Sequence, residues 1–183
     1  GHSSGLGLEL TNLYLEAGAT VIGMARRSIS NKHPSLYQFH FDLSRQGEWE
    51  AKVRNNLPRN DWSRIILVNC AGTISPTATF GKMDGERIQS SITLNVTTPL
   101  RLMNLIVSMF APASIRIANI SSGAAHKAYP GWGVYCSSKA ALDMASQVLA
   151  AEMELSQKDI RVVSYSPGPI DTAMQAEIRK KTS

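Results

Sequence analysis

Residues 1–7 read Gly1-His2-Ser3-Ser4-Gly5-Leu6-Gly7 and lead directly into an apolar-rich stretch that ends at Gly18. Glycines spaced as GxxxGxG permit a tight turn and let backbone N–H groups approach a bound anion closely. The following stretch is typical of a helix with a glycine C-cap, and a helix N-terminus favours a pyrophosphate. Taken alone, the motif also fits a glycine-rich turn that binds nothing.

Short apolar runs alternate with longer amphipathic stretches through the rest of the chain. The pattern predicts strands over residues 19–25, 36–41, 64–69, 115–120 and 160–165, and helices over residues 46–57, 95–110 and 134–155. This alternation, with strands apolar on both sides, indicates an α/β fold: a Rossmann-type doubly wound parallel sheet with helices on both faces. Such sheets bind ligands at the carboxyl ends of their strands.

The length of 183 residues suits a single domain. We therefore treat residues 1–183 as one unit. Because the chain opens on a strand-to-helix turn and stops soon after a new helix begins, we expect the first strand and the C-terminal part of the fold to be missing. The domain is thus expected to be truncated at both ends.

Composition excludes several classes of partner. The net charge is +5, but basic residues are scattered apart from Arg26-Arg27 and residues 179–181, which does not predict a nucleic-acid surface. No apolar run approaches the roughly 18 residues of a membrane span. Cys70 and Cys136 lack metal-ligand spacing and are too few for a disulfide framework, so we expect no metal site and a cytoplasmic location.

Arg26 and Arg27 follow the strand that succeeds the glycine motif. Dinucleotide-binding folds discriminate between NAD and NADP at this position, about twenty residues after the glycines. An acidic residue there binds the adenosine ribose, whereas a guanidinium group binds the 2′-phosphate. The sequence therefore predicts NADP as cofactor, with solvated surface arginines as the alternative.

Tyr135 and Lys139 are spaced i, i+4 on a predicted helix, so their side chains share one face. A free tyrosine, with a pKa of about 10, is a poor acid–base catalyst at neutral pH, and a nearby ammonium group favours its phenolate. Without further motifs, a simple helix-surface pair explains this spacing better than catalysis does.

Further motifs surround the pair. Asn119-Ile120-Ser121-Ser122-Gly123 ends a predicted strand before the tyrosine, and Pro167-Gly168-Pro169-Ile170-Asp171-Thr172 follows the next strand. With the glycine loop and Asn69-Cys70-Ala71-Gly72, these segments resemble the short-chain dehydrogenase/reductase family in order and spacing. Cys70 departs from the family's second asparagine, which puts the local hydrogen bonds of that turn in doubt.

The resemblance implies an oxidoreductase that transfers hydride between NADP and a carbonyl group. Tyr135 would protonate the carbonyl oxygen and Ser122 would polarise it. Lys139 would bind the nicotinamide ribose and depress the pKa of Tyr135, while Asn95 would hold a water that links Lys139 to solvent. These roles are physically coherent, because the site mainly orients the cofactor's own hydride chemistry.

The same resemblance implies which residues bind the cofactor. Asp42 would contact adenine, although it also suits a turn or a helix cap, and Ile170 and Thr172 would fix the carboxamide. The complete set comprises Gly1, Ser3, Ser4, Gly5, Leu6, Gly7, Arg26, Arg27, Asp42, Asn69, Ala71, Gly72, Tyr135, Lys139, Pro167, Gly168, Ile170 and Thr172.

Residues 131–136, followed by Asp143-Met144, and residues 169–175 resemble sepiapterin reductases and the related bacterial benzil reductases. Those proteins reduce vicinal dicarbonyl compounds with NADPH. The resemblance implies a carbonyl reductase whose substrate contacts are Ser122, Trp132, Tyr135 and Met174. Trp132 also suits simple packing near the site, and Met174 suits packing of a lid onto the body.

The family resemblance further implies a homodimer or homotetramer formed through the helices over residues 95–110 and 134–155. Two other functions stay open. The same residues serve an NADP-dependent alcohol dehydrogenase running toward oxidation. A non-catalytic NADP-binding sensor would keep the fold without the chemistry.

Overall fold

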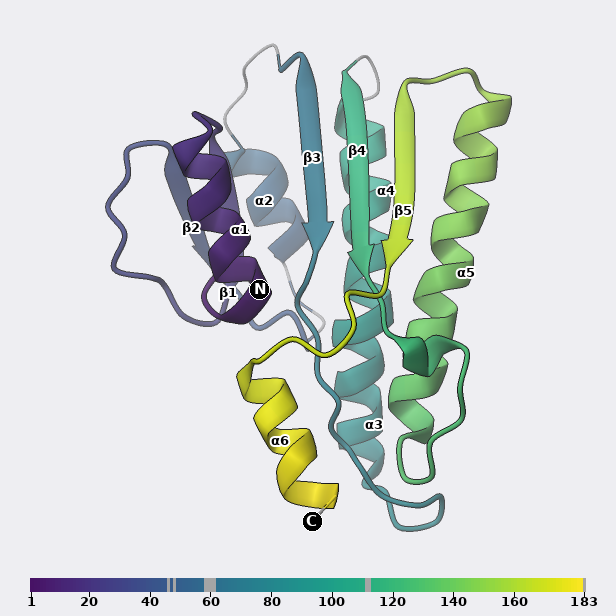
Figure 1. Cartoon of the computed structure of the whole chain (residues 1–183). Helices are drawn as coiled ribbons and strands as arrows, with labels where there is room; N and C mark the ends of the chain where they lie inside the picture. The colour runs from purple at the N-terminus through teal and green to yellow at the C-terminus, as the bar shows by residue number, and fades with distance from the viewer. Residues whose placement is uncertain (46, 48, 58–61, 111–112, 183) are drawn as a thin grey trace.

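Strands and helices alternate along most of the chain (Figure 1). The computed structural model describes residues 1–183 apart from 46, 48, 58–61, 111–112 and 183. Its strands are β1 (Val21–Ala25), β2 (Leu36–His40), β3 (Arg64–Asn69), β4 (Ser114–Ile120) and β5 (Ile160–Tyr165). Its helices are α1 (Gly5–Glu16), α2 (Trp49–Asn56), α3 (Gly85–Ile92), α4 (Thr98–Phe110), α5 (Gly133–Leu155) and α6 (Ala173–Thr182).

All strand pairs are parallel, as the alternation of elements predicted. β1 pairs with β2, and β4 lies between β3 and β5 in a second sheet. Among the described residues no ladder joins β1 to β3. These two strands instead border an apolar cleft whose lining includes Val21, Gly23, Ile65 and Leu67. The parallel direction is confirmed, but the strands form two sheets rather than one continuous sheet.

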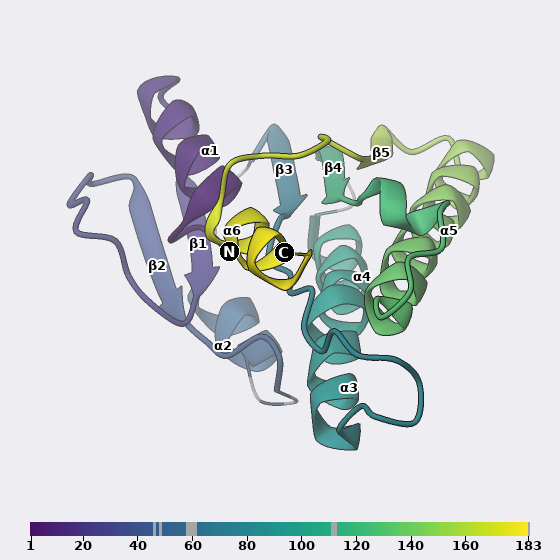
Figure 2. The same cartoon turned by 60° about the horizontal axis from the view of Figure 1, so that its bottom comes forward.

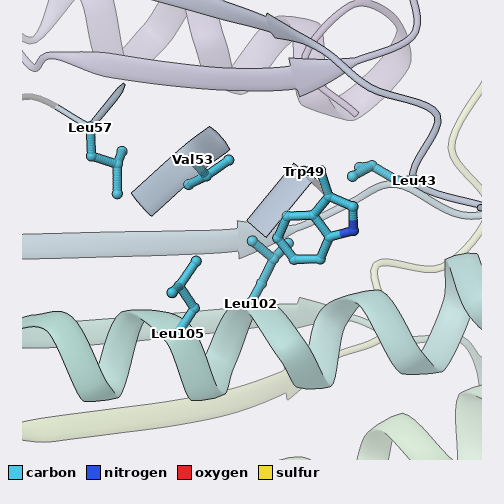
Figure 3. Close-up of a cluster of buried hydrophobic side chains, with 6 residues drawn as sticks. All are labelled: Leu43, Trp49, Val53, Leu57, Leu102 and Leu105. Atoms are coloured by element: carbon cyan, nitrogen blue, oxygen red, sulfur yellow. The ribbon is translucent and has the colours of Figure 1, made fainter. Parts of the chain in front are cut away.

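The core lies on one side of the strands, where three helices cover them. One buried cluster joins Trp49 and Val53 of α2 to Leu102 and Leu105 of α4, and Ile22 of β1 packs against it (Figure 3). A second cluster places α4 and α5 against β4 and β5. In both views α1 lies on the other side of β1 (Figures 1 and 2). Helices therefore lie on both sides of β1, as predicted.

The helix expected over residues 95–110 begins earlier than its amphipathic pattern indicated. Helix α3 starts at Gly85 because the Asp84 side chain caps it, accepting a hydrogen bond of 2.9 Å from the Arg87 backbone N–H. A π-helical turn, Thr93–Thr97, then joins α3 to α4. Such turns are frequent at functional sites. The sequence analysis missed α3 and this turn.

The arrowheads of β1, β3, β4 and β5 point toward the same end of the molecule (Figure 1). Helix α6 lies beyond that end, in front of the strands when the molecule is turned (Figure 2). It follows the Pro-Gly segment, where a new helix was predicted. None of the described helices is long and apolar enough to cross a membrane.

Candidate active site

A groove runs across the carboxyl ends of the strands, where the predicted site segments meet. It is lined by the glycine loop, by Arg26 and Arg27 after β1, by the segment after β4, and by residues 166–170 after β5. Of the residues predicted for catalysis, cofactor or substrate, only Asn69 and Asn95 do not line it. Motifs spread over more than 170 residues thus form one site.

The glycine loop, residues 1–7, packs tightly where it lines this groove. A Cβ atom on Gly7 would lie 1.9 Å from the carbonyl oxygen of Gly1, so only glycine fits this close approach. Ser4, the N-cap of α1, makes no side-chain capping hydrogen bond. The first N–H groups of α1 are therefore without that cap, beside a groove that the loop lines. This arrangement fits the pyrophosphate of a dinucleotide.

Arg26 and Arg27 follow β1 directly, are exposed and line the groove. Asp42 lines the same region and also caps a turn, since its Oδ1 accepts hydrogen bonds from the Ser44 backbone N–H at 3.1 Å and the Ser44 hydroxyl at 2.6 Å. The bond from the Ser44 side chain lowers the pKa of Asp42. Both roles considered for Asp42 are therefore compatible with its position.

Ser122, Tyr135 and Lys139 come together at the end of β4. Ser122 caps the 3-10 turn Gly123–Ala125, its Oγ accepting from the Ala124 N–H at 3.2 Å. Tyr135 lies in the first turn of α5, near enough to Ser122 for the serine hydroxyl to lower the pKa of the phenol. Lys139, one turn later, donates from Nζ to the Ile120 carbonyl oxygen at 2.6 Å. The predicted helical spacing and the clustering of the three side chains are both present.

Asn95 is buried behind the groove, in the π-helical turn. Its Oδ1 accepts from the Thr73 N–H at 2.9 Å, and its Nδ2 donates to the Thr73 carbonyl at 2.8 Å and the Ser138 hydroxyl at 3.1 Å. The side chain thereby joins the segment after β3 to α5. Its visible role is to position the loop that carries Gly72.

Asn69 differs from the neighbouring residues of its motif. Ala71 and Gly72 line the groove, whereas the Asn69 side chain is buried and donates to Asn119 Oδ1 at 2.7 Å. Asn119 in turn donates to the Ser146 hydroxyl at 2.8 Å. Asn69 therefore ties β3 to β4 and, through Asn119, to α5, and its side chain is turned away from the cofactor groove.

A family model described as short chain dehydrogenase matches residues 1–183. The chain belongs to the short-chain dehydrogenase family. A benzil reductase ((S)-benzoin forming) of Bacillus subtilis (strain 168) is 36% identical over 187 residues, which cover 100% of this chain and 77% of that relative. A sepiapterin reductase of Bos taurus is 39% identical over 134 residues, covering 70% of this chain and 48% of the relative. The predicted resemblance to these two groups is confirmed.

Solved structures show the same fold. A short-chain dehydrogenase/reductase from Burkholderia vietnamiensis superposes with a TM-score of 0.83 at 31% identity, covering 100% of this chain and 88% of the other. A 4-hydroxyisoleucine dehydrogenase complexed with NADH gives a TM-score of 0.84 at 26% identity, covering 99% and 78%. The chain therefore has the short-chain dehydrogenase fold and belongs to an oxidoreductase family.

Burial controls the charges in the site of this short-chain dehydrogenase. It lowers the pKa of Lys139 to about 8, and the Asp143 carboxylate opposes the shift. Burial also raises the pKa of Tyr135, against the lowering effect of the Ser122 hydrogen bond. Lys139 is not among the causes of this shift, so the expected lowering of the tyrosine pKa by Lys139 stays a prediction. The Lys139 Nζ lies 5.7 Å from the Tyr135 ring centroid and bonds instead to Ile120.

Asp143 is a site residue whose role sequence reasoning missed. Its carboxylate is buried, accepts a short hydrogen bond from the Ser164 hydroxyl and lies 3.1 Å from His126 Nε2. It follows Lys139 by one helical turn, so the i, i+4 spacing was a signal that could have found it. The residue supplies the negative charge that partly offsets burial of the lysine ammonium.

We expect the activity of this enzyme to fall as the pH rises through about 8, because Lys139, which is predicted to bind the ribose hydroxyls, then loses its charge. Asp143→Asn removes the charge that raises the lysine pKa, so the alkaline limb should move to lower pH. The measurement is kcat/KM as a function of pH. Asp159→Asn, which alters an exposed ion pair with Arg116, is the control. An unchanged limb in Asp143→Asn would contradict the electrostatic role.

Proposed function

We propose that this short-chain dehydrogenase is an NADPH-dependent carbonyl reductase that transfers hydride to a ketone, with vicinal dicarbonyl compounds as its substrate class. The observation that carries the proposal is the pair of neighbouring hydroxyls on Ser122 and Tyr135, which both line the groove. The pair lies beside Lys139 in a groove that also contains the glycine loop and two arginines. Such a pair can bind and protonate one carbonyl oxygen.

In the proposed reaction, bound NADPH supplies the hydride. Tyr135 donates its phenolic proton to the carbonyl oxygen, and Ser122 donates a hydrogen bond that stabilises the charge developing there. Burial raises the pKa of Tyr135, so the phenol carries the proton that this step requires at neutral pH. Lys139 binds the ribose hydroxyls and holds the nicotinamide end in place.

Arg26 and Arg27 support the choice of NADP. Both arginines are exposed and line the groove, and the connection from β1 to β2, residues 26–35, contains no acidic residue that would bind a ribose 2′-hydroxyl. Planar guanidinium groups bind phosphate by paired hydrogen bonds. Of the residues proposed to bind NADP, those of the glycine loop would bind the pyrophosphate, and Ile170 and Thr172 would bind the carboxamide.

A row of aromatic rings supports an aryl substituent on the substrate. Trp132 lies between Tyr129 and Tyr135, with ring centroids separated by 5.0 Å and 6.0 Å respectively. All three residues line the groove. Ile74 and Ala124 are buried beside Tyr135, and Met174 of α6 packs against them. We propose that an aromatic ring next to the reacting carbonyl binds along this row, with Trp132 and Met174 as contacts.

We also propose a homodimer or homotetramer that uses α4 and α5. Among the described residues, Leu100 of α4 and Met144, Val148 and Leu155 of α5 are large apolar side chains that are 39%, 59%, 49% and 85% exposed. Apolar surface of this kind on long helices is stabilised by burial against a second copy.

The first test measures NADPH consumption with benzil, diacetyl and a simple monoketone, with NADH as the comparison. We expect turnover of dicarbonyls and a preference for NADPH. Tyr135→Phe should lower kcat at least about 100-fold while NADPH affinity stays within about threefold, because the proton donor alone is lost. Tyr37→Phe, at an exposed position on β2, is the matched control. Full activity of Tyr135→Phe would refute the mechanism.

Tyr129→Leu tests the aromatic row. Tyr129 contacts Trp132, so its loss should lower the ratio of kcat/KM for benzil to kcat/KM for diacetyl by about tenfold. Tyr129→Phe keeps the ring and should keep the ratio. An equal loss for both substrates would show that the row only stabilises the fold.

Sedimentation velocity tests the assembly. We expect a dimer or tetramer at micromolar protein, and we expect Met144→Glu combined with Val148→Glu to dissociate it, because two charges cannot be buried without partners. Leu13→Glu, at an exposed apolar position on α1, should leave the assembly intact. A wild-type protein that sediments only as a monomer would overturn this proposal.

A further inference from the structure

The side chain of Gln38 connects three parts of the molecule that belong to different sequence motifs. Its Oε1 accepts a hydrogen bond of 2.8 Å from the Ile29 N–H, and its Nε2 donates to the Ile29 carbonyl at 3.2 Å. The same Oε1 lies 2.9 Å from Nε2 of His2 in the glycine loop. We call these three residues the His2–Gln38–Ile29 clamp.

The clamp depends on a hollow in β1. Gly23 is paired with Gln38 in the register of β1 and β2. A Cβ atom on Gly23 would lie 2.4 Å from Cγ of His2, so the imidazole ring occupies the space that any side chain there would need. His2 is only 6% exposed as a result. The ring can cross the strand to reach Gln38 because residue 23 is glycine.

Ile29 connects the clamp to the two arginines. Ile29 follows Arg27 by two residues, in the connection between β1 and β2, and its backbone is held by both of its polar groups. Another tie of this connection to β2 joins Ser28 Oγ and His40 Nε2 at 2.8 Å, on the exposed side. The clamp therefore fixes where the backbone that carries Arg26 and Arg27 lies relative to the glycine loop.

We propose that Gln38 and His2 are positioning residues that set the preference of this enzyme for a dinucleotide bearing a 2′-phosphate; this inference rests on the NADP use proposed above. The pyrophosphate at the glycine loop and the 2′-phosphate at the arginines belong to one ligand molecule. Both ends are bound well only when the spacing of the two protein sites is held in advance.

The ligands themselves separate this role from general stability. NADH lacks the 2′-phosphate, so displacement of the two arginines should change the affinity for NADH little. NADPH loses charge-assisted hydrogen bonds when the guanidinium groups move. Weakening the clamp should therefore reduce affinity for NADPH more than affinity for NADH.

The test is the ratio of the dissociation constants of NADH and NADPH, measured by titration of the full chain. Gln38→Leu removes both contacts to Ile29 and should lower the preference for NADPH by about tenfold. His2→Ala leaves the contacts to Ile29 and should lower it less. Tyr37→Leu, at the neighbouring exposed position on β2, is the matched control and should leave the ratio unchanged.

Arg26→Ala with Arg27→Ala shows whether the clamp acts through the arginines. We expect this double variant to lose the preference, and Gln38→Leu added to it should change the ratio no further. A ratio that Gln38→Leu and His2→Ala leave unchanged, or an equal loss of both cofactors, would overturn the inference alone. A wild-type enzyme without preference for NADPH would overturn the proposed cofactor as well.

Discussion

Lys139 is only 6% exposed, so its ammonium group is buried in the site. The surrounding residues must therefore stabilise a buried positive charge. A buried charge is costly unless polar partners surround it. The end of β4 provides the Ile120 carbonyl at 2.6 Å, and the next turn of α5 provides the Asp143 carboxylate. The contacts of Lys139 therefore fix how β4 and α5 pack together. The same two elements carry Ser122 and Tyr135 into the site.

Buried polar side chains extend this constraint to the neighbouring strands. Asn69 and Asn119 join β3 to β4, and Asn95 joins the segment after β3 to α5. Fully bonded networks of this kind specify one packing, because each group is costly when left without a partner. Hydrogen bonds behind the groove therefore determine its shape. The hydroxyls of Ser122 and Tyr135 can face the groove because other side chains hold the strands and helices together.

The sequence predicted the parts of the structure that depend on local pattern. The strand periods, the helix that carries Tyr135 and Lys139, the glycine loop and the Pro-Gly segment all lie where expected. Long-range contacts decided the rest. Burial raises the pKa of Tyr135, an inter-strand bond turns Asn69 out of the groove, and the clamp joins His2 to a residue 36 positions away. No motif spacing encodes these contacts.

The π-helical turn at Thr93–Thr97 sets the rotation of Asn95 about the helix axis relative to the core residues of α4. Successive residues of an α-helix are rotated by about 100° around the axis. Removing Val96 or Thr97, which lie between Asn95 and α4, would therefore rotate Asn95 relative to the buried face of α4, which carries Leu102 and Leu105. The helix geometry thus constrains the number of residues in this segment separately from their identity.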